Sequence, residues 1–256
     1  MILFSRNYGE TGPTLLILHG LFGQSDNWAG IARKLSDKYR IYVFDLRNHG
    51  ESDHSEDFSY ELMAEDVIET IEAAFLGNVH LLGHSMGGKV AMVVAQKRPD
   101  LLKSLLVADI APKYYRPHHE EIIKGLNALN PKEIKSRPEA EEELENYIPD
   151  FGTRQFLLKN LGRADDNSFE WKFNLKVLTE KIENIGKAID NTVSKVPALF
   201  YRGEKSRYVN DEDYESIKKI FPNAEFSEMK DAGHWLHAEN PNEMMKTIEE
   251  WIAKNE

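Results

Sequence analysis

The chain has 256 residues, 41% of them hydrophobic and 29% charged, as expected of one globular unit with a sizeable core. Its formal net charge of -11 repels phosphate backbones and anionic lipid surfaces, so we expect neither nucleic acid nor a membrane as partner. The chain contains no cysteine, which excludes disulfides, thiolate metal sites and a cysteine nucleophile. No apolar stretch suits a signal peptide or a membrane span, and we expect a monomeric cytoplasmic protein.

Short apolar runs that end near glycine-containing turns alternate with stretches of helical period along the chain. This alternation is typical of a parallel sheet covered by helices. We predict buried strands at 14–19, 41–45, 78–83, 105–110, 197–201 and 224–229. Helices that pack on the sheet are predicted at 28–35, 60–75, 86–96, 211–221 and 242–254.

The alternation breaks between Lys113 and Lys195, where strand signals are missing and acidic, helix-forming text such as PEAEEELENY at 138–147 appears. We therefore predict an α/β fold with a mostly parallel twisted sheet covered by helices on both faces. Its core would comprise residues 1–112 and 196–256, with a helical cap inserted at 113–195. Seven apolar residues of the cap could line an acyl pocket, although packing between cap helices explains each of them as well: Phe151, Phe156, Leu157, Trp171, Phe173, Leu175 and Leu178.

The sharpest local signal is GHSMG at 83–87, between a predicted strand and a predicted helix. This is the nucleophile-elbow pattern, in which glycines on both sides permit a tight turn that projects the serine hydroxyl above the sheet. The helix that begins at Met86 points its amino end at the same place, which stabilises negative charge there. A glycine-rich packing turn would leave the serine without a role, so we interpret Ser85 as a nucleophile.

A second glycine-containing turn, HGLFG at 19–23, follows the first predicted buried strand. Acyl transfer needs two hydrogen-bond donors for the forming oxyanion, one after the nucleophile and one in a loop after an earlier strand. We predict that the N–H groups of Leu21 and Met86 supply them, with the Phe22 N–H as the weaker candidate.

A serine hydroxyl is a poor nucleophile until a base takes its proton, and nine histidines compete for that role. His234 follows the last predicted strand in DAGHW, where a short loop can lower its imidazole onto Ser85. His84 would point elsewhere on the elbow, and we expect His237 to be structural on the next helical turn. We therefore predict His234 as the base.

The order of nucleophile, acid and histidine matches the α/β-hydrolase superfamily. The segments HGLFG, FDLRNHGES, GHSMGGK, ADIAP and GHWLHAENP resemble most the small bacterial YbfF-type esterases. The resemblance spans the sheet on both sides of the insertion and is weakest inside it. It implies an ester or thioester hydrolase that needs no metal or organic cofactor and carries a helical cap.

The acid departs from the commonest superfamily pattern, which places an aspartate a few residues after the strand at 197–201. Ser206 occupies that position here. The histidine still needs a carboxylate, and Asp109, at the end of the preceding strand, could reach it; the YbfF-type resemblance supports this relocation. We predict Asp109 as the acid and Ser206 as an auxiliary hydrogen-bonding partner of the histidine, with Glu204 and Asp211 as fallback acids.

Together these residues predict a serine carboxylic-ester hydrolase that forms an acyl-enzyme on Ser85 and acts on small-molecule esters or thioesters of short to medium acyl length. We expect Phe22, Tyr114 and Trp235 to border the substrate, because they adjoin the oxyanion loop, the cap entrance and the base. A carbon–carbon bond hydrolase or a haloperoxidase side activity would use a similar constellation. A non-catalytic small-ligand receptor on the same fold is the alternative from a different class, but such receptors commonly lose part of the triad.

Overall fold

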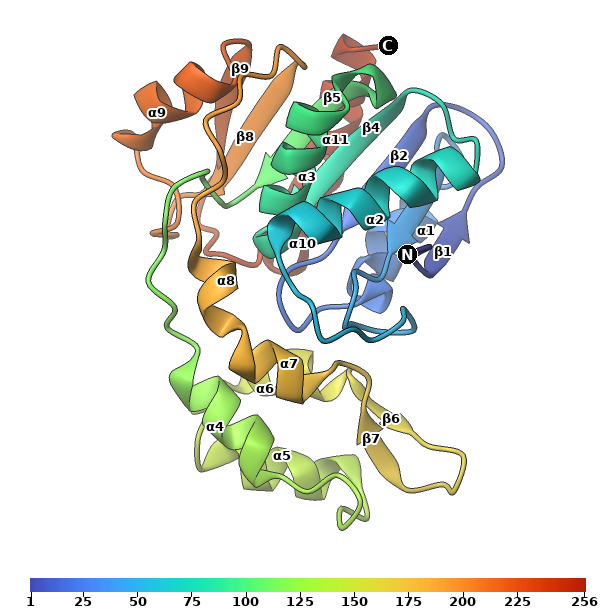
Figure 1. The fold of residues 1–256 in the computed structure, drawn as a ribbon, viewed down its shortest axis with the longest axis vertical. Coiled ribbons are helices and arrows are strands. Elements are labelled where there is room, and N and C mark those ends of the chain that lie inside the picture. Colours follow the sequence, from blue (N-terminus) through green and yellow to red (C-terminus); the bar gives the residue numbers. More distant parts are fainter.

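The computed structural model describes every residue from Met1 to Glu256. One large sheet of seven strands forms its centre (Figure 1). The strands are β1 (Ser5–Tyr8), β2 (Thr14–Leu18), β3 (Arg40–Phe44), β4 (Val79–His84), β5 (Leu102–Ala108), β8 (Ala198–Gly203) and β9 (Ala224–Met229). Their order is β1-β3-β2-β4-β5-β8-β9, and only the pair of β1 and β3 is antiparallel.

Helices cover both faces of this sheet. On one face, α2 (Tyr60–Ala73), α3 (Met86–Lys97) and α9 (Asp213–Ile220) contribute to one apolar cluster, while α1 (Ala29–Leu35) and α11 (Pro241–Lys254) contribute to a second cluster on the other face. Figure 1 shows α2 and α3 in front of the strands and α11 behind them. Every residue of β2 and β4 is buried, so neither strand alternates between apolar and solvent-facing polar residues.

The remaining helices of the sheet region are short. They are η1 (Ser25–Trp28), η2 (Pro99–Leu101) and α10 (Leu236–Glu239). None of the helices combines the length and apolar character needed to cross a membrane.

The chain between β5 and β8 forms a separate group of elements below the sheet in Figure 1. It contains α4 (Glu120–Ala128), α5 (Arg137–Glu145), α6 (Phe151–Leu158), α7 (Leu175–Glu180) and α8 (Ile182–Gly186), and two antiparallel strands, β6 (Leu161–Arg163) and β7 (Phe169–Trp171). The expectation that this stretch lacks strands is therefore wrong. Strands of three residues are too short to show an alternating pattern. The division into a core and an inserted cap stays a prediction.

The sequence also left β1 unpredicted, because its residues SRNY form a polar edge strand without an apolar run. The other six strands of the sheet were predicted within a few residues of their observed ends. The parallel order has a direct consequence for function. Because the carboxyl ends of parallel strands meet at one edge, the residues that follow β2, β4 and β5 lie together there.

Candidate active site

Ser85 lies on a strained turn between β4 and α3. Its φ of 52° and ψ of -120° are unusual for a residue with a side chain. A Cβ on Gly83 would lie 2.2 Å from the Gly87 carbonyl oxygen, and one on Gly87 would lie 2.5 Å from that of Leu18. The Ser85 N–H donates to the Ala108 carbonyl at 3.0 Å. Both glycines and the neighbouring strand therefore hold the serine in this conformation.

The side chains predicted as nucleophile, base and acid form one line of hydrogen bonds. His234 Nε2 lies 3.0 Å from Ser85 Oγ, and His234 Nδ1 lies 2.7 Å from Asp109 Oδ2. The Asp109 side chain is fully buried, and its other oxygen accepts the Gly203 N–H at 3.1 Å. His84 points away from the serine hydroxyl and contacts the His234 carbonyl oxygen at 2.8 Å. This arrangement permits a proton to pass from the hydroxyl to an imidazole that a carboxylate orients.

Ser206 does not hydrogen-bond the histidine, contrary to the prediction. Its hydroxyl donates instead to Asp109 Oδ2, the same oxygen that faces His234. When the imidazole donates its Nδ1–H to the carboxylate, Nδ1 has no free lone pair, so it cannot accept a hydrogen bond from the Ser206 hydroxyl. The charged oxygen is the better acceptor. Ser206 thus contacts the acid rather than the base.

The fallback acids lie in other interactions. Glu204 pairs with Lys230 at 3.0 Å and accepts the Asp231 N–H at 2.9 Å. Asp211 pairs with Arg202 at 2.9 Å. Neither carboxylate hydrogen-bonds the histidine, so the geometry favours Asp109 over both.

Two backbone amides beside Ser85 are free to bind an oxyanion. The N–H groups of Leu21 and Met86 make no hydrogen bond within the chain. The weaker candidate, the Phe22 N–H, is already used, because it donates to His49 Nε2 at 3.2 Å. Burial lowers the pKa of His49 to about 3, which keeps this ring neutral and able to accept. The arrangement therefore leaves the predicted pair available.

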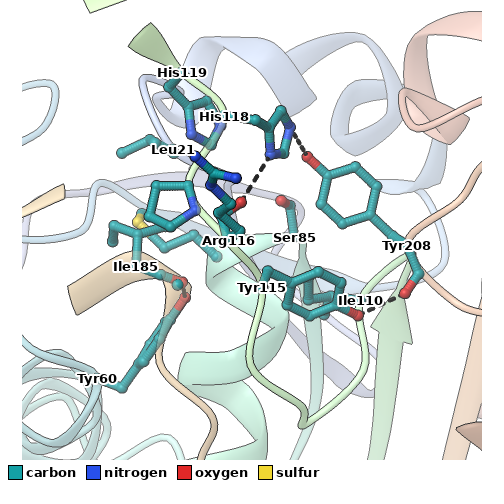
Figure 2. A pocket seen from close by; sticks show the side chains of 13 residues that line it. Leu21, Tyr60, Ser85, Ile110, Tyr115, Arg116, His118, His119, Ile185 and Tyr208 are labelled. Carbon is teal, nitrogen blue, oxygen red and sulfur yellow. Dashed lines mark hydrogen bonds between the residues drawn. The ribbon is translucent and has the colours of Figure 1, made fainter. Parts of the chain in front are cut away.

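Two cavities meet at Ser85. We call them the base-side cavity, which reaches His234 and Trp235, and the α8-side cavity, which reaches Tyr60 and Ile185 (Figure 2). Both are lined by Leu21, Ser85, His118, His119 and Tyr208. The base-side cavity has a volume of about 220 Å³ and the α8-side cavity about 30 Å³.

Two of the three residues expected to border the substrate line a cavity. Phe22 and Trp235 both line the base-side cavity. Tyr114 lines neither and is 57% exposed, so its prediction is wrong. Its neighbour Tyr115 takes the place, because its hydroxyl accepts the Ala111 N–H at 2.9 Å and donates to the Tyr208 carbonyl at 2.6 Å. These two bonds turn Tyr115 inward and leave Tyr114 to solvent.

Of the seven apolar residues of the insertion that were predicted as possible pocket residues, some line a cavity and others do not. Phe156 and Leu157 line the base-side cavity. Phe173 and Trp171 stack on each other with ring centroids 5.2 Å apart, as packing residues would. The five candidates that line neither cavity are Phe151, Trp171, Phe173, Leu175 and Leu178.

Sequence reasoning missed Tyr208, which stands in the turn after β8. Its ring stacks on the His234 imidazole at 4.0 Å between centroids and 17° between planes. Its hydroxyl lies 2.9 Å from His118 Nε2, and Figure 2 shows this contact above Ser85. The only signal in the sequence is the position of Tyr208 two residues after Ser206.

Two histidines near the serine, His84 and His119, are uncharged. Burial lowers the pKa of His119 to about 4 and that of His84 well below its ordinary value. Both rings are therefore neutral near neutral pH, and they add polarity without charge. No three His, Asp or Glu side chains are grouped to hold a metal ion.

Comparisons with known proteins identify the family of the chain. A family model described as alpha/beta hydrolase fold matches residues 13–124. Esterase YbfF of Escherichia coli (strain K12) is 32% identical and covers 97% of this chain and 96% of its own length. The sn-1-specific diacylglycerol lipase ABHD11 of Danio rerio is 35% identical, over 94% of this chain and 78% of that protein.

A solved structure described as a marine microorganism esterase has a TM-score of 0.94 and 44% identity, and covers 97% of this chain and 98% of that one. The predicted fold and the predicted resemblance are confirmed by these findings. The esterase and lipase relatives also support the predicted hydrolase of the carboxylesterase type. The chain therefore belongs to the α/β-hydrolase family.

Proposed function

We propose that the chain is a serine carboxylic-ester hydrolase that forms an acyl-enzyme on Ser85. The observation that carries the proposal is the line of hydrogen bonds from Ser85 Oγ through His234 to Asp109. The substrates are small-molecule esters or thioesters of short to medium acyl length. We also propose that the enzyme works in the cytoplasm as a monomer.

In the first half of the reaction, His234 Nε2 takes the Ser85 proton while Oγ bonds to the acyl carbon. The carbonyl oxygen becomes an oxyanion, which the N–H groups of Leu21 and Met86 stabilise. Loss of one such donor costs about 100- to 1,000-fold in rate in comparable enzymes. The Asp109 carboxylate accepts the Nδ1–H bond of the imidazolium and stabilises its charge.

The tetrahedral intermediate then collapses. The bond from the acyl carbon to the leaving oxygen or sulfur breaks, and His234 returns its proton to that atom. In the second half, a water gives its proton to His234 and attacks the acyl carbon. The bond to Ser85 Oγ breaks, Oγ regains a proton, and the carboxylic acid leaves.

The test is hydrolysis of a chain-length series of p-nitrophenyl esters and acyl thioesters by the wild type and by Ser85→Ala. We expect turnover in the wild type and its loss in the variant, with unchanged thermal unfolding as the folding control. Turnover that survives in Ser85→Ala would contradict the proposed nucleophile. A wild type that binds these esters without hydrolysing them would favour the non-catalytic receptor.

A further inference from the structure

The two cavities at Ser85 differ in size and in the groups that line them. We propose that they divide the substrate, with the acyl group in the α8-side cavity and the leaving alcohol or thiol in the base-side cavity. This inference rests on the proposed function. It adds a substrate class, namely esters of short acyl groups with larger, aromatic or polar leaving groups.

The position of the base assigns the leaving group. His234 must return its proton from Nε2 to the leaving atom, so that atom has to lie beside Nε2. His234 lines the base-side cavity and is absent from the α8-side cavity. Tyr208 covers one face of the imidazole, and Asp109 occupies its Nδ1 edge. The leaving group therefore departs on the base side.

The tetrahedral carbon carries four groups: Ser85 Oγ, the oxyanion, the leaving group and the acyl chain. Once the first three are placed, the acyl chain has one direction left. Leu21 and Met86, whose N–H groups face the oxyanion, both line the α8-side cavity beside Ser85. Tyr60 and Ile185 also line this cavity, and Figure 2 shows these two residues next to each other. An acyl chain bound to Ser85 would therefore extend between apolar walls.

The size of this cavity limits the acyl chain. At about 30 Å³ against about 220 Å³, the α8-side cavity is the smaller of the two, so it suits the smaller part of the ester, a short acyl group. Its walls are fixed by hydrogen bonds. The Tyr60 hydroxyl donates to the Ile185 carbonyl at 2.7 Å, and the Tyr115 hydroxyl donates to the Tyr208 carbonyl at 2.6 Å. Longer chains would have to break these contacts.

The base-side cavity suits a larger group. Phe156 packs against Trp235 with ring centroids 4.3 Å apart, which provides an aromatic wall. Thr153 and His234 add polar atoms, and neither residue lines the α8-side cavity. Aromatic and polar leaving groups match this lining.

The test uses two substrate series. One varies the acyl group of p-nitrophenyl esters from acetate to octanoate, and the other varies the alcohol of acetate esters from methyl to naphthyl. We expect Ile185→Ala to raise the ratio of kcat/KM for hexanoate over acetate by about tenfold or more. This change keeps the backbone carbonyl that binds Tyr60. Phe156→Ala is the matched change in the other cavity, and it is expected to alter the preference among alcohols while the hexanoate-to-acetate ratio stays constant.

Ile185→Val is a milder variant for the same purpose, with a smaller shift in the same direction. The division is overturned if Phe156→Ala widens the acyl range while Ile185→Ala changes only the alcohol preference. It is also overturned if the wild type prefers octanoate to acetate. Those outcomes leave a Ser85-dependent hydrolase intact, whereas turnover that survives Ser85→Ala contradicts the proposed function and this inference together.

Discussion

Asp109 reaches His234 from the end of β5, and its Oδ2 lies 2.7 Å from the imidazole Nδ1. The turn after β8, where the superfamily usually carries its acid, contributes Ser206 instead. That hydroxyl donates to the same carboxylate oxygen, while Gly203 N–H binds the other. The acid and the hydroxyl that donates to it thus lie after the ends of two neighbouring strands, β5 and β8.

The first prediction concerns the roles of Asp109 as the acid and Ser206 as a donor to it. We expect Asp109→Asn to lower kcat for p-nitrophenyl acetate by about 10,000-fold, because the amide disfavours the required imidazole tautomer. Ser206→Ala removes one of the hydrogen bonds to the carboxylate but keeps its charge, and we expect it to lower kcat by about tenfold. Steady-state kinetics of both folded variants measure this. A larger loss in Ser206→Ala than in Asp109→Asn would contradict the assignment.

The second prediction concerns the ring stacked on the base. An aromatic face within about 6 Å stabilises a cation by about 0.5–2 kcal/mol, so Tyr208 favours the imidazolium that forms on His234. We expect Tyr208→Leu to lower kcat for p-nitrophenyl acetate by between about twofold and thirtyfold, which corresponds to this range of energies. Tyr208→Phe keeps the ring and should keep kcat. Steady-state kinetics of both folded variants measure this, and an unchanged kcat in Tyr208→Leu would show that the ring only fills space.

The sequence could predict those features that short patterns encode. The apolar run of β2 and the glycines around Ser85 predict a sheet strand and the elbow. The place of His234 after the last predicted strand predicts its contact with Ser85. The polar edge strand β1 and the short pair β6 and β7 carry no such pattern, and they form because of pairing with distant or neighbouring segments.

The missed site features depend on contacts that no local pattern contains. Tyr115 rather than Tyr114 faces the site because of its bond to a residue 93 positions later, Tyr208. Tyr208 itself meets His234 only through the fold. Ser206 contacts the acid rather than the base because His234 Nδ1 faces Asp109 Oδ2, and this orientation of the ring is set by the fold.

The third prediction concerns a buried lysine behind the α8-side cavity. Lys89 is fully buried and donates to the carbonyls of Lys113 at 2.9 Å and Lys187 at 2.5 Å, which lie on the two connections between the sheet and the inserted elements. We expect Lys89→Met to lower the free energy of unfolding by about 2 kcal/mol or more, because both carbonyls lose their donor.

Lys97→Met is the matched control for this change on the same helix. Lys97 is 39% exposed and pairs with Glu65, and such surface pairs contribute about 0–1 kcal/mol. Urea unfolding of both variants gives the comparison. Equal losses of stability in the two variants would contradict a role for Lys89 at the connections.

The fourth prediction concerns stability in acid. Burial lowers the pKa of His237 from 6.5 to about 3, so between these values the unfolded chain binds more protons than the folded one. Stability therefore falls as pH decreases from about 6.5 towards 3. His237→Phe keeps an aromatic ring against Trp28, on which His237 stacks at 4.4 Å, and removes the titration. With decreasing pH, we expect the free energy of unfolding of this variant to fall less steeply than that of the wild type. The difference in slope is up to about 1.4 kcal/mol per pH unit. Urea unfolding at several pH values measures both slopes, and identical slopes would contradict the assignment.

The central claim is that an acyl group passes through Ser85. Its most direct test is rapid mixing with p-nitrophenyl acetate, followed by acid quench and peptide mass analysis. The account predicts a burst of about one p-nitrophenolate per active site wherever deacylation limits turnover, and an acetyl group on the peptide that contains Ser85. To accumulate the intermediate, the quench is taken at the earliest times and at saturating ester. An acetyl group on another residue, or hydrolysis that persists in Ser85→Ala, would contradict the account.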